Sequence, residues 1–227
     1  MKLSPPLLGI LFDFDGLIVD TEMPIFQAWK MKFREFGEEL LVEDWGQIVG
    51  KSSNELGPLE DFLARFADPE EKEKVLAEVA QAERTLVEEQ RPLPGAEELI
   101  ERSHAAGLQL GIVSSSDQDW VHSHLDRLGL LGYFHHTSCA DEVENAKPDP
   151  ALYHLGLEKM SLPPDRVVVL EDSPHGVLAA KRAGLFCIAV PNQLTGQLPF
   201  FKNGGSPDLV INTLEDFPWD DFMRVDP

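Results

Sequence analysis

Short apolar runs that alternate with helical patterns constrain the fold of this chain more than any other feature of its sequence. The first run ends at "ILFDFDG" (10–16), and four more follow at "LQLGIVS" (108–114), "RVVVLE" (166–171), "FCIAV" (186–190) and "DLVI" (208–211). Each is short, rich in Val, Ile or Leu, and bounded by Gly, Pro or polar residues, as buried strands are. Helical patterns occupy 95–107, 117–129 and 173–184. Strands that alternate with helices predict an α/β fold with a doubly wound parallel sheet.

Residues 22–90 interrupt this alternation with helix after helix. Their second half is rich in charged, strongly helix-forming residues, with a break at Asp68-Pro69. The stretch leaves the α/β pattern just after the first strand and rejoins it at "RPLPG" (91–95), whose prolines and glycine fit a linker. A chain of 227 residues can hold a core and a smaller second unit. We therefore expect residues 1–20 and 91–227 to form an α/β core domain, with residues 21–90 inserted as a helical domain.

Charge and cysteine content narrow the class of protein. The chain has 19 Lys and Arg against 40 Asp and Glu, a formal net charge of -21. Such a charge repels nucleic acid and anionic membranes, but it does not exclude an anionic small substrate, because a bound divalent cation can invert the local field. Cys139 and Cys187 form no CxxC pair and are typical of a reducing compartment. No signal peptide or membrane span is recognised, so we expect a cytoplasmic protein that binds neither nucleic acid nor membranes.

Polar residues that can carry chemistry stand at the predicted strand ends. Asp13 and Asp15 interrupt the first apolar run, and their i, i+2 spacing starts them on one side of the strand. Ser114 ends the second run, Glu171-Asp172 ends the third, and Lys147 lies in "AKPDP" (146–150). Ligands of open α/β sheets bind at the carboxyl ends of the strands, so these groups should converge. Carboxylates this close need a cation or a shared proton, although each residue taken alone is also typical of a turn or a helix cap.

Four of these segments together resemble the haloacid dehalogenase-like superfamily, in its branch with a helical cap inserted after the first strand. "DFDGLIVDTE", "GIVSSS", "AKPDP" and "VVVLEDSPHGVLAAKRAG" are similar to its four motifs in their order. The resemblance implies a Rossmann-like core and a phosphatase that forms an aspartyl-phosphate on Asp13, with Asp15 as general acid and base. It also implies Mg²⁺ held by Asp13, the Asp15 carbonyl and Asp172, while Glu171 either binds the ion or orients its neighbours. Ser114, Ser115 and Lys147 would then hold the phosphoryl group of a small-molecule substrate.

The same resemblance indicates which part of the helical insertion selects the substrate. By family position the candidate contacts are Glu22, Trp29, Gly50, Lys51, Ser52 and Asn54, with "GKSSNE" as the specificity loop. A β-phosphoglucomutase-like phosphomutase shares all four core motifs and is the nearest alternative. Its cap histidine and arginine correspond here to Ile25 and Ser53, which favours hydrolysis. A non-catalytic binding module of the same fold is the alternative from another class. We expect a monomer.

Other conspicuous residues favour structural roles. His135-His136 lacks ligands at metal-binding spacing, and His122 and His124 are two apart on a predicted helix. "KNGGSP" (202–207) follows no strand and opens no helix, so it predicts a loop rather than a phosphate-binding turn. The four tryptophans are too dispersed to form a binding stripe: Trp29, Trp45, Trp120 and Trp219.

Overall fold

A single parallel sheet organises the core of the protein. The computed structural model describes residues 3–4, 6–46, 49, 58–198 and 206–223. Within these residues the sheet has six strands in the order β3-β2-β1-β4-β5-β6, and every strand pair is parallel. The strands are β1 (Gly9–Phe12), β2 (Gln109–Val113), β3 (His136–Ser138), β4 (Val167–Glu171), β5 (Phe186–Ala189) and β6 (Leu209–Val210). The doubly wound parallel sheet is thus confirmed, and the central strands β2, β1 and β4 end side by side.

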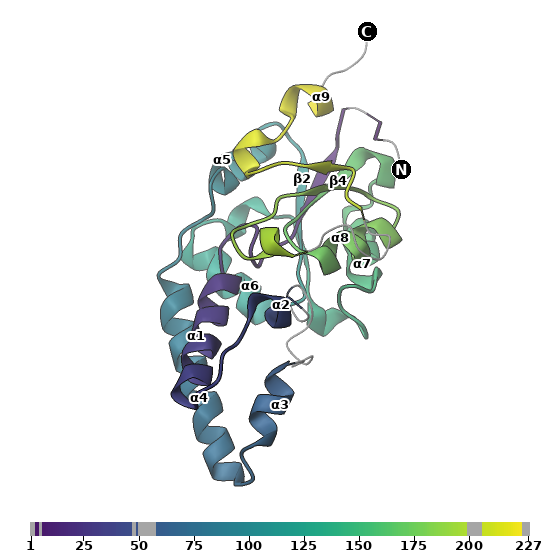
Figure 1. Cartoon of the computed structure of the whole chain (residues 1–227). Coiled ribbons are helices and arrows are strands. Elements are labelled where there is room, and N and C mark those ends of the chain that lie inside the picture. The colour runs from purple at the N-terminus through teal and green to yellow at the C-terminus, as the bar shows by residue number, and fades with distance from the viewer. Residues whose placement is uncertain (1–2, 5, 47–48, 50–57, 199–205, 224–227) are drawn as a thin grey trace.

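Helices cover both faces of this sheet because the buried strand residues alternate between two clusters. Ile10 and Phe12 of β1 belong to the cluster that packs against α5 (Ala96–Ala105) and α6 (Gln118–Arg127). Leu11 points to the opposite cluster, which packs against α7 (Ala151–Met160) and α8 (Pro174–Arg182). Both α6 and α8 begin at a side-chain N-cap, where Asp117 and Ser173 accept hydrogen bonds from backbone N–H groups. The last described helix, α9 (Trp219–Met223), lies near α5 at the upper end of Figure 1.

The sequence patterns missed one strand of the sheet. β3 has three residues, His136, Thr137 and Ser138, and it pairs only with β2 at the edge of the sheet. An edge strand that is half exposed needs no run of Val, Ile or Leu, so the apolar pattern that marks the central strands is absent there. The helix α7 was also not predicted.

Four helices fill the described part of the stretch between β1 and the linker: α1 (Glu22–Glu35), α2 (Val42–Trp45), α3 (Pro58–Ala64) and α4 (Pro69–Glu88). In Figure 1, α1, α3 and α4 lie toward the lower end, where α1 and α4 run side by side. An aromatic cluster holds them together, with Phe33 stacked on Phe62 at 4.1 Å between ring centroids. The buried Lys32 of α1 also pairs with Glu78 of α4 at 2.9 Å. Leu194 and Leu198, which follow β5, join the same cluster and connect it to the core.

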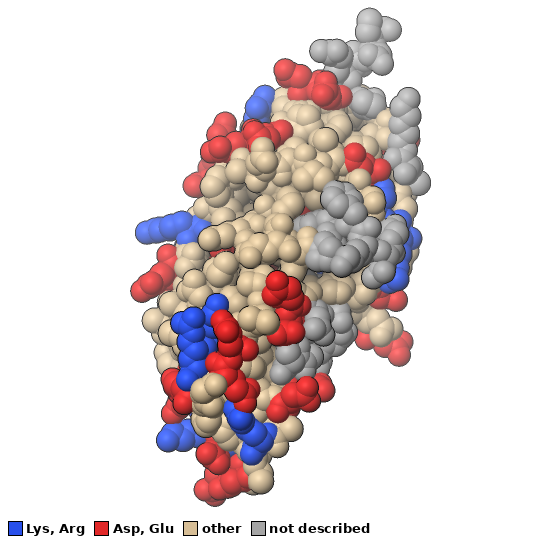
Figure 2. All heavy atoms as spheres, in the orientation of Figure 1, with Lys and Arg blue, Asp and Glu red and all other residues tan. Residues whose placement is uncertain are grey.

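The surface is acidic, as the net charge requires. On the face drawn in Figure 2, carboxylates are spread over the upper and lower parts of the molecule, and the lysine and arginine groups at its lower end stand beside carboxylates. Of the helices in the described ranges, none has the length and apolar character of a membrane-spanning segment.

Candidate active site

The turn after β1 places two carboxylates at the carboxyl edge of the sheet. Asp13 is 6% exposed and follows the last residue of β1, and Asp15 comes two residues later. Gly16 then adopts a positive φ of 85°. A Cβ atom at Gly16 would lie 2.4 Å from Oδ2 of Asp172, so both the backbone conformation and the close approach require glycine.

A buried ammonium group joins the first and fourth strands. Lys147 Nζ donates to Asp13 Oδ1 at 2.5 Å, to Glu171 Oε1 at 2.6 Å and to the Val113 carbonyl at 2.8 Å. Glu171 also accepts from Tyr153 OH at 2.8 Å through Oε1, and from the backbone N–H and hydroxyl of Ser173 at 3.1 and 3.2 Å through Oε2. Each oxygen of Glu171 therefore already has two donors from the protein.

Asp172 differs from its neighbour in having one oxygen to spare. Its Oδ2 accepts from Asn192 Nδ2 at 2.7 Å, while Oδ1 is buried without a hydrogen-bond partner among the described residues. Oxygens of Asp13, Glu171 and Asp172 lie within 4.8 Å of one another. A buried set of carboxylate oxygens with one unsatisfied atom fits a hard divalent cation such as Mg²⁺.

Burial and crowding shift the pKa values of these acids. Burial, and then the negative charge of Glu171, raise the pKa of Asp13 to about 8 despite the bond from Lys147. Burial and the charges of Asp13 and Glu171 raise the pKa of Asp172 well above its ordinary value. For Lys147, burial opposes the charged form, but the two carboxylates outweigh it and raise the pKa. The ammonium thus compensates only part of the negative charge that the three acids can carry.

The carboxylate of Asp15 is held by four donors from three segments. Thr21 Oγ1 and Trp120 Nε1 each donate to Oδ1 at 2.8 Å. Ser116 Oγ donates to Oδ2 at 2.7 Å, and Ser114 Oγ does so at 3.1 Å. The strand-end pattern predicts Ser114 here, but it indicates none of the other three donors, and the spacing of the tryptophans predicts no binding role for Trp120. Its signal is that α6 begins where β2 ends, so its first turn faces the carboxyl edge of the sheet.

The remaining predicted site residues have different surroundings. Ser115 is buried beside Ser114. Glu22 opens α1, and its charge contributes to the raised pKa of Asp172, which places it near the acids. Trp29 is buried in the aromatic cluster, edge-on to Phe62. The predicted contacts at Gly50, Lys51, Ser52 and Asn54, together with Ser53 and most of the "KNGGSP" loop, lie outside the described residues.

The histidines that the sequence indicates are not metal ligands make ordinary polar contacts. His135 Nδ1 accepts from the Leu110 N–H at 3.2 Å, and the His122 ring lies 3.1 Å from the Thr137 hydroxyl. Within the described ranges, the one group of three or more potential ligand residues close enough to share an ion is Asp13, Glu171 and Asp172.

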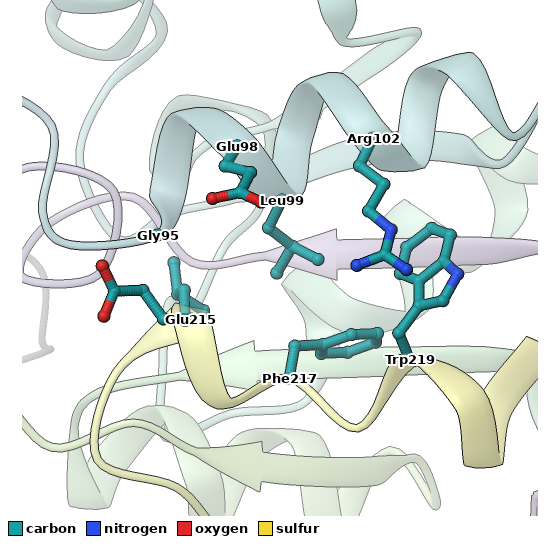
Figure 3. Close-up of a pocket in the computed structure, with 8 residues that line it drawn as sticks. Gly95, Glu98, Leu99, Arg102, Glu215, Phe217 and Trp219 are labelled. Atoms are coloured by element: carbon teal, nitrogen blue, oxygen red, sulfur yellow. The ribbon is translucent and has the colours of Figure 1, made fainter.

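A separate pocket lies between α5 and the segment that leads to α9. It has a volume of about 170 Å³ and contains none of the predicted site residues. Figure 3 shows the Arg102 guanidinium over the Trp219 indole ring, at 4.3 Å from the ring centroid, with Glu98 and Glu215 toward the other end. The acids flanking this pocket give it no resemblance to a phosphate site.

Comparison with known proteins identifies the family. A family model described as haloacid dehalogenase-like hydrolase matches residues 10–190. YhcW of Bacillus subtilis is 37% identical over 194 residues, which cover 85% of this chain and 87% of that protein. A phosphorylated carbohydrates phosphatase of Thermotoga maritima is 31% identical over 222 residues, covering 92% of this chain and 98% of that protein.

A solved structure agrees with these relatives. The crystal structure of CbbY from Rhodobacter sphaeroides in complex with phosphate matches with a TM-score of 0.73 and 26% identity, covering 93% of this chain and 96% of that chain. The family predicted from the four motifs is confirmed. The chain belongs to the haloacid dehalogenase-like hydrolase family, within which it is a phosphoric monoester hydrolase.

Proposed function

We propose that the chain is a Mg²⁺-dependent phosphatase that hydrolyses a small phosphorylated metabolite through an aspartyl-phosphate on Asp13. The observation that carries this proposal is the contrast between the two neighbouring acids: Asp172 keeps a buried oxygen free, while Glu171 is saturated by donors. Asp172 offers a carboxylate oxygen within 4.8 Å of oxygens of Asp13 and Glu171, and Lys147 pairs with Asp13. These groups lie at the edge of the sheet where ligands of this fold class bind.

The chain's own residues supply the steps of such a reaction. The Asp13 carboxylate attacks phosphorus, and the bond to the leaving oxygen breaks. Asp15 gives that oxygen a proton and then takes one from the water that hydrolyses the aspartyl-phosphate. Lys147 supplies a fixed positive charge beside the transferring group, and Ser114 holds Asp15 in place through its hydroxyl.

The donor set explains why a cation is needed. Asp13 and Asp172 would hold Mg²⁺, with Glu171 fixing Lys147 instead of binding the ion directly. The bound ion supplies positive charge that stabilises the ionised acids and the charge that develops on the phosphoryl oxygens. Without it, burial and the charge of Glu171 raise the pKa of Asp13 and so disfavour the ionised form of this nucleophile.

We assign residues 21–90 to a helical cap that closes over this site. The aromatic cluster packs α1, α3 and α4 against one another, and the charge of Glu22 at the start of α1 acts on Asp172. Closure of such a unit excludes bulk water and positions the leaving group. A sugar, polyol or nucleotide-related phosphomonoester is the proposed substrate class, in keeping with the name of the Thermotoga maritima relative. The cytoplasm is the proposed compartment, since both described cysteines are free and buried.

Hydrolysis of an aryl phosphate tests the reaction, and a screen of phosphorylated metabolites tests the substrate class. We expect Mg²⁺ to support release of inorganic phosphate and EDTA to abolish it. Phosphate release that continues unchanged in EDTA would contradict the proposed cation site. A preparation that is inactive on every phosphomonoester in the screen would favour the non-catalytic binding module.

Incubation with β-glucose 1-phosphate and catalytic glucose 1,6-bisphosphate separates hydrolysis from phosphomutase action. A mutase must hold a second phosphate, and the cap position that corresponds to its histidine is Ile25, which packs partly buried against the aromatic cluster. We therefore expect little glucose 6-phosphate. Efficient conversion to glucose 6-phosphate without phosphate release would replace the phosphatase assignment by the mutase.

A further inference from the structure

We infer that Asn192 is a positioning residue for the cation site. Its side-chain amide orients the Asp172 carboxylate and ties it to the turn that carries Asp15. This inference rests on the proposed Mg²⁺ site. Asn192 belongs to none of the four motifs, and it reaches the site from the loop after β5.

The orientation of the Asn192 amide follows from its neighbours. Its Oδ1 accepts from the backbone N–H groups of Leu194 and Thr195, both at 2.9 Å. Backbone N–H groups only donate, so the atom that faces them must be the oxygen. The Nδ2 group therefore points the other way, where it donates to Asp172 Oδ2 at 2.7 Å and to the Gly16 carbonyl at 2.9 Å.

The loop that carries Asn192 is firmly anchored. The Asn192 N–H donates to the Thr195 hydroxyl at 3.0 Å, and its carbonyl accepts from the Gly196 N–H at 2.9 Å. Thr195 is fully buried, and Leu194 packs into the aromatic cluster. Because hydrogen bonds already fix its side-chain oxygen and its backbone, Asn192 loses little further conformational freedom when it binds a carboxylate. It is therefore a suitable positioning group.

The contact matters because the two neighbouring acids are fixed unequally. Glu171 is held by Lys147, Tyr153 and Ser173 together. The terminal torsion of an aspartate is broad, so Asp172 needs a donor to select one rotation of its carboxylate. The bond from Asn192 occupies Oδ2 and so leaves the buried, unpartnered Oδ1 as the oxygen available to an ion shared with Asp13.

Gly16 is the third member of this junction. A Cβ atom there would lie 2.7 Å from Asn192 Nδ2 and 2.4 Å from Asp172 Oδ2, so only a glycine lets the turn approach both groups. Asn192 thus fixes the distance between Asp172 and the segment whose Asp13 and Asp15 complete the site.

The test is the dissociation constant of Mg²⁺, measured by calorimetry on the full chain without substrate. Asn192→Ser keeps a hydroxyl that can accept, more weakly than the amide oxygen, from the following N–H groups, but its side chain is too short to reach Asp172. Gln197→Ala is the matched control, because it removes another side-chain bond of the same loop, from Nε2 to the Gln193 carbonyl, on an exposed residue. Asp172→Asn is the reference for loss of the ligand itself.

We expect Asn192→Ser to weaken Mg²⁺ binding by about 10- to 100-fold, the range for residues that orient metal ligands, and Gln197→Ala to leave it within about twofold. If Asn192→Ser lowers the melting temperature in EDTA but leaves the dissociation constant of Mg²⁺ unchanged, the inference is overturned and Asn192 only anchors the loop. If Asn192→Ser fails to fold, Asn192→Asp keeps the loop acceptor, and Mg²⁺ binding as tight as in the wild type or tighter is then the refuting result. If Asp172→Asn itself binds Mg²⁺ normally, the proposed cation site fails, and the inference fails with it.

Discussion

Replacing Glu171 should mainly lower the stability of the fold, whereas replacing Asp172 should mainly weaken metal binding. Glu171→Gln keeps the size of a side chain that accepts four hydrogen bonds, from Lys147, Tyr153 and Ser173. An amide offers one oxygen and an NH₂ group, so two of the four bonds lose their acceptor. Lys147 also loses one of its two carboxylate partners, although Asp13 remains.

The cost of this change is about 2–4 kcal/mol of unfolding free energy, given the penalties for unsatisfied buried donors and for broken buried ion pairs. In a chain of this length that corresponds to a fall in melting temperature of about 4–16 °C. Asp172→Asn should cost under about 1 kcal/mol, because the raised pKa of Asp172 means that the ion-free protein already disfavours its charge. The order of the two effects reverses for Mg²⁺ affinity. We expect the affinity to fall about tenfold in Glu171→Gln and more than about 100-fold in Asp172→Asn.

Thermal unfolding in EDTA and calorimetric titration with Mg²⁺ measure the two quantities independently. Circular dichroism of each variant at 20 °C controls for folding. The reasoning fails if Asp172→Asn melts as early as Glu171→Gln, or if Glu171→Gln shows the larger loss of Mg²⁺ affinity. The second outcome would make Glu171 a direct ligand of the ion.

Three further changes test the roles of individual side chains. Asp13→Asn should leave less than about a tenth of kcat, and a rise of under about 1.4 kcal/mol in activation free energy would reject Asp13 as the nucleophile. Trp120→Phe removes the donor to Asp15 and keeps an aromatic ring, although a smaller one. It should lower kcat for alkyl phosphates about tenfold more than for p-nitrophenyl phosphate, and equal losses would refute the role of Trp120 in orienting the general acid. Burial raises the pKa of Glu83 from 4.5 to about 7 although Trp29 bonds to it, so folding takes up a proton and stability falls as the pH rises from about 4.5 to 7. Because Glu83 is partly buried, Glu83→Gln should remove that fall and raise the free energy of unfolding by about 1–3 kcal/mol at pH 8, measured by chemical denaturation. An unchanged dependence of stability on pH would contradict the raised pKa of Glu83.

The strand-end residues could be predicted because the topology of a parallel sheet decides where they lie. Once "ILFDFDG", "GIVS" and "VVVLE" are assigned to strands, their last residues must meet at one edge, and the structure brings Asp13, Ser114 and Glu171 together there. The helical character of the inserted stretch also followed from local composition. β3 did not, because its three partly buried residues at the edge of the sheet carry no apolar pattern.

Residues that reach the site from helices or loops left no comparable signal. Tyr153 lies on the buried face of α7, where an aromatic residue is expected for packing alone, and its hydroxyl contact with Glu171 depends on how α7 crosses the sheet. Asn192 sits in "PNQLT", a sequence typical of any loop, and reaches Asp172 only because β5 pairs beside β4. Such partners depend on distances between segments that neither periodicity nor composition contains.

The charge balance of the site shows why these supporting contacts are needed. Three buried acids face one buried ammonium, and burial raises the pKa of Asp13 and Asp172. A divalent cation bound at the proposed site would therefore have to displace protons from these acids. Such an arrangement stabilises the fold less than a neutral core of the same volume would. The site keeps its shape through groups that remain bonded whether or not the ion is bound, with Tyr153 and Ser173 on Glu171 and Asn192 on Asp172. Because these donors occupy one acid completely and the other only in part, the oxygen left for a cation is set by the protein before the cation arrives.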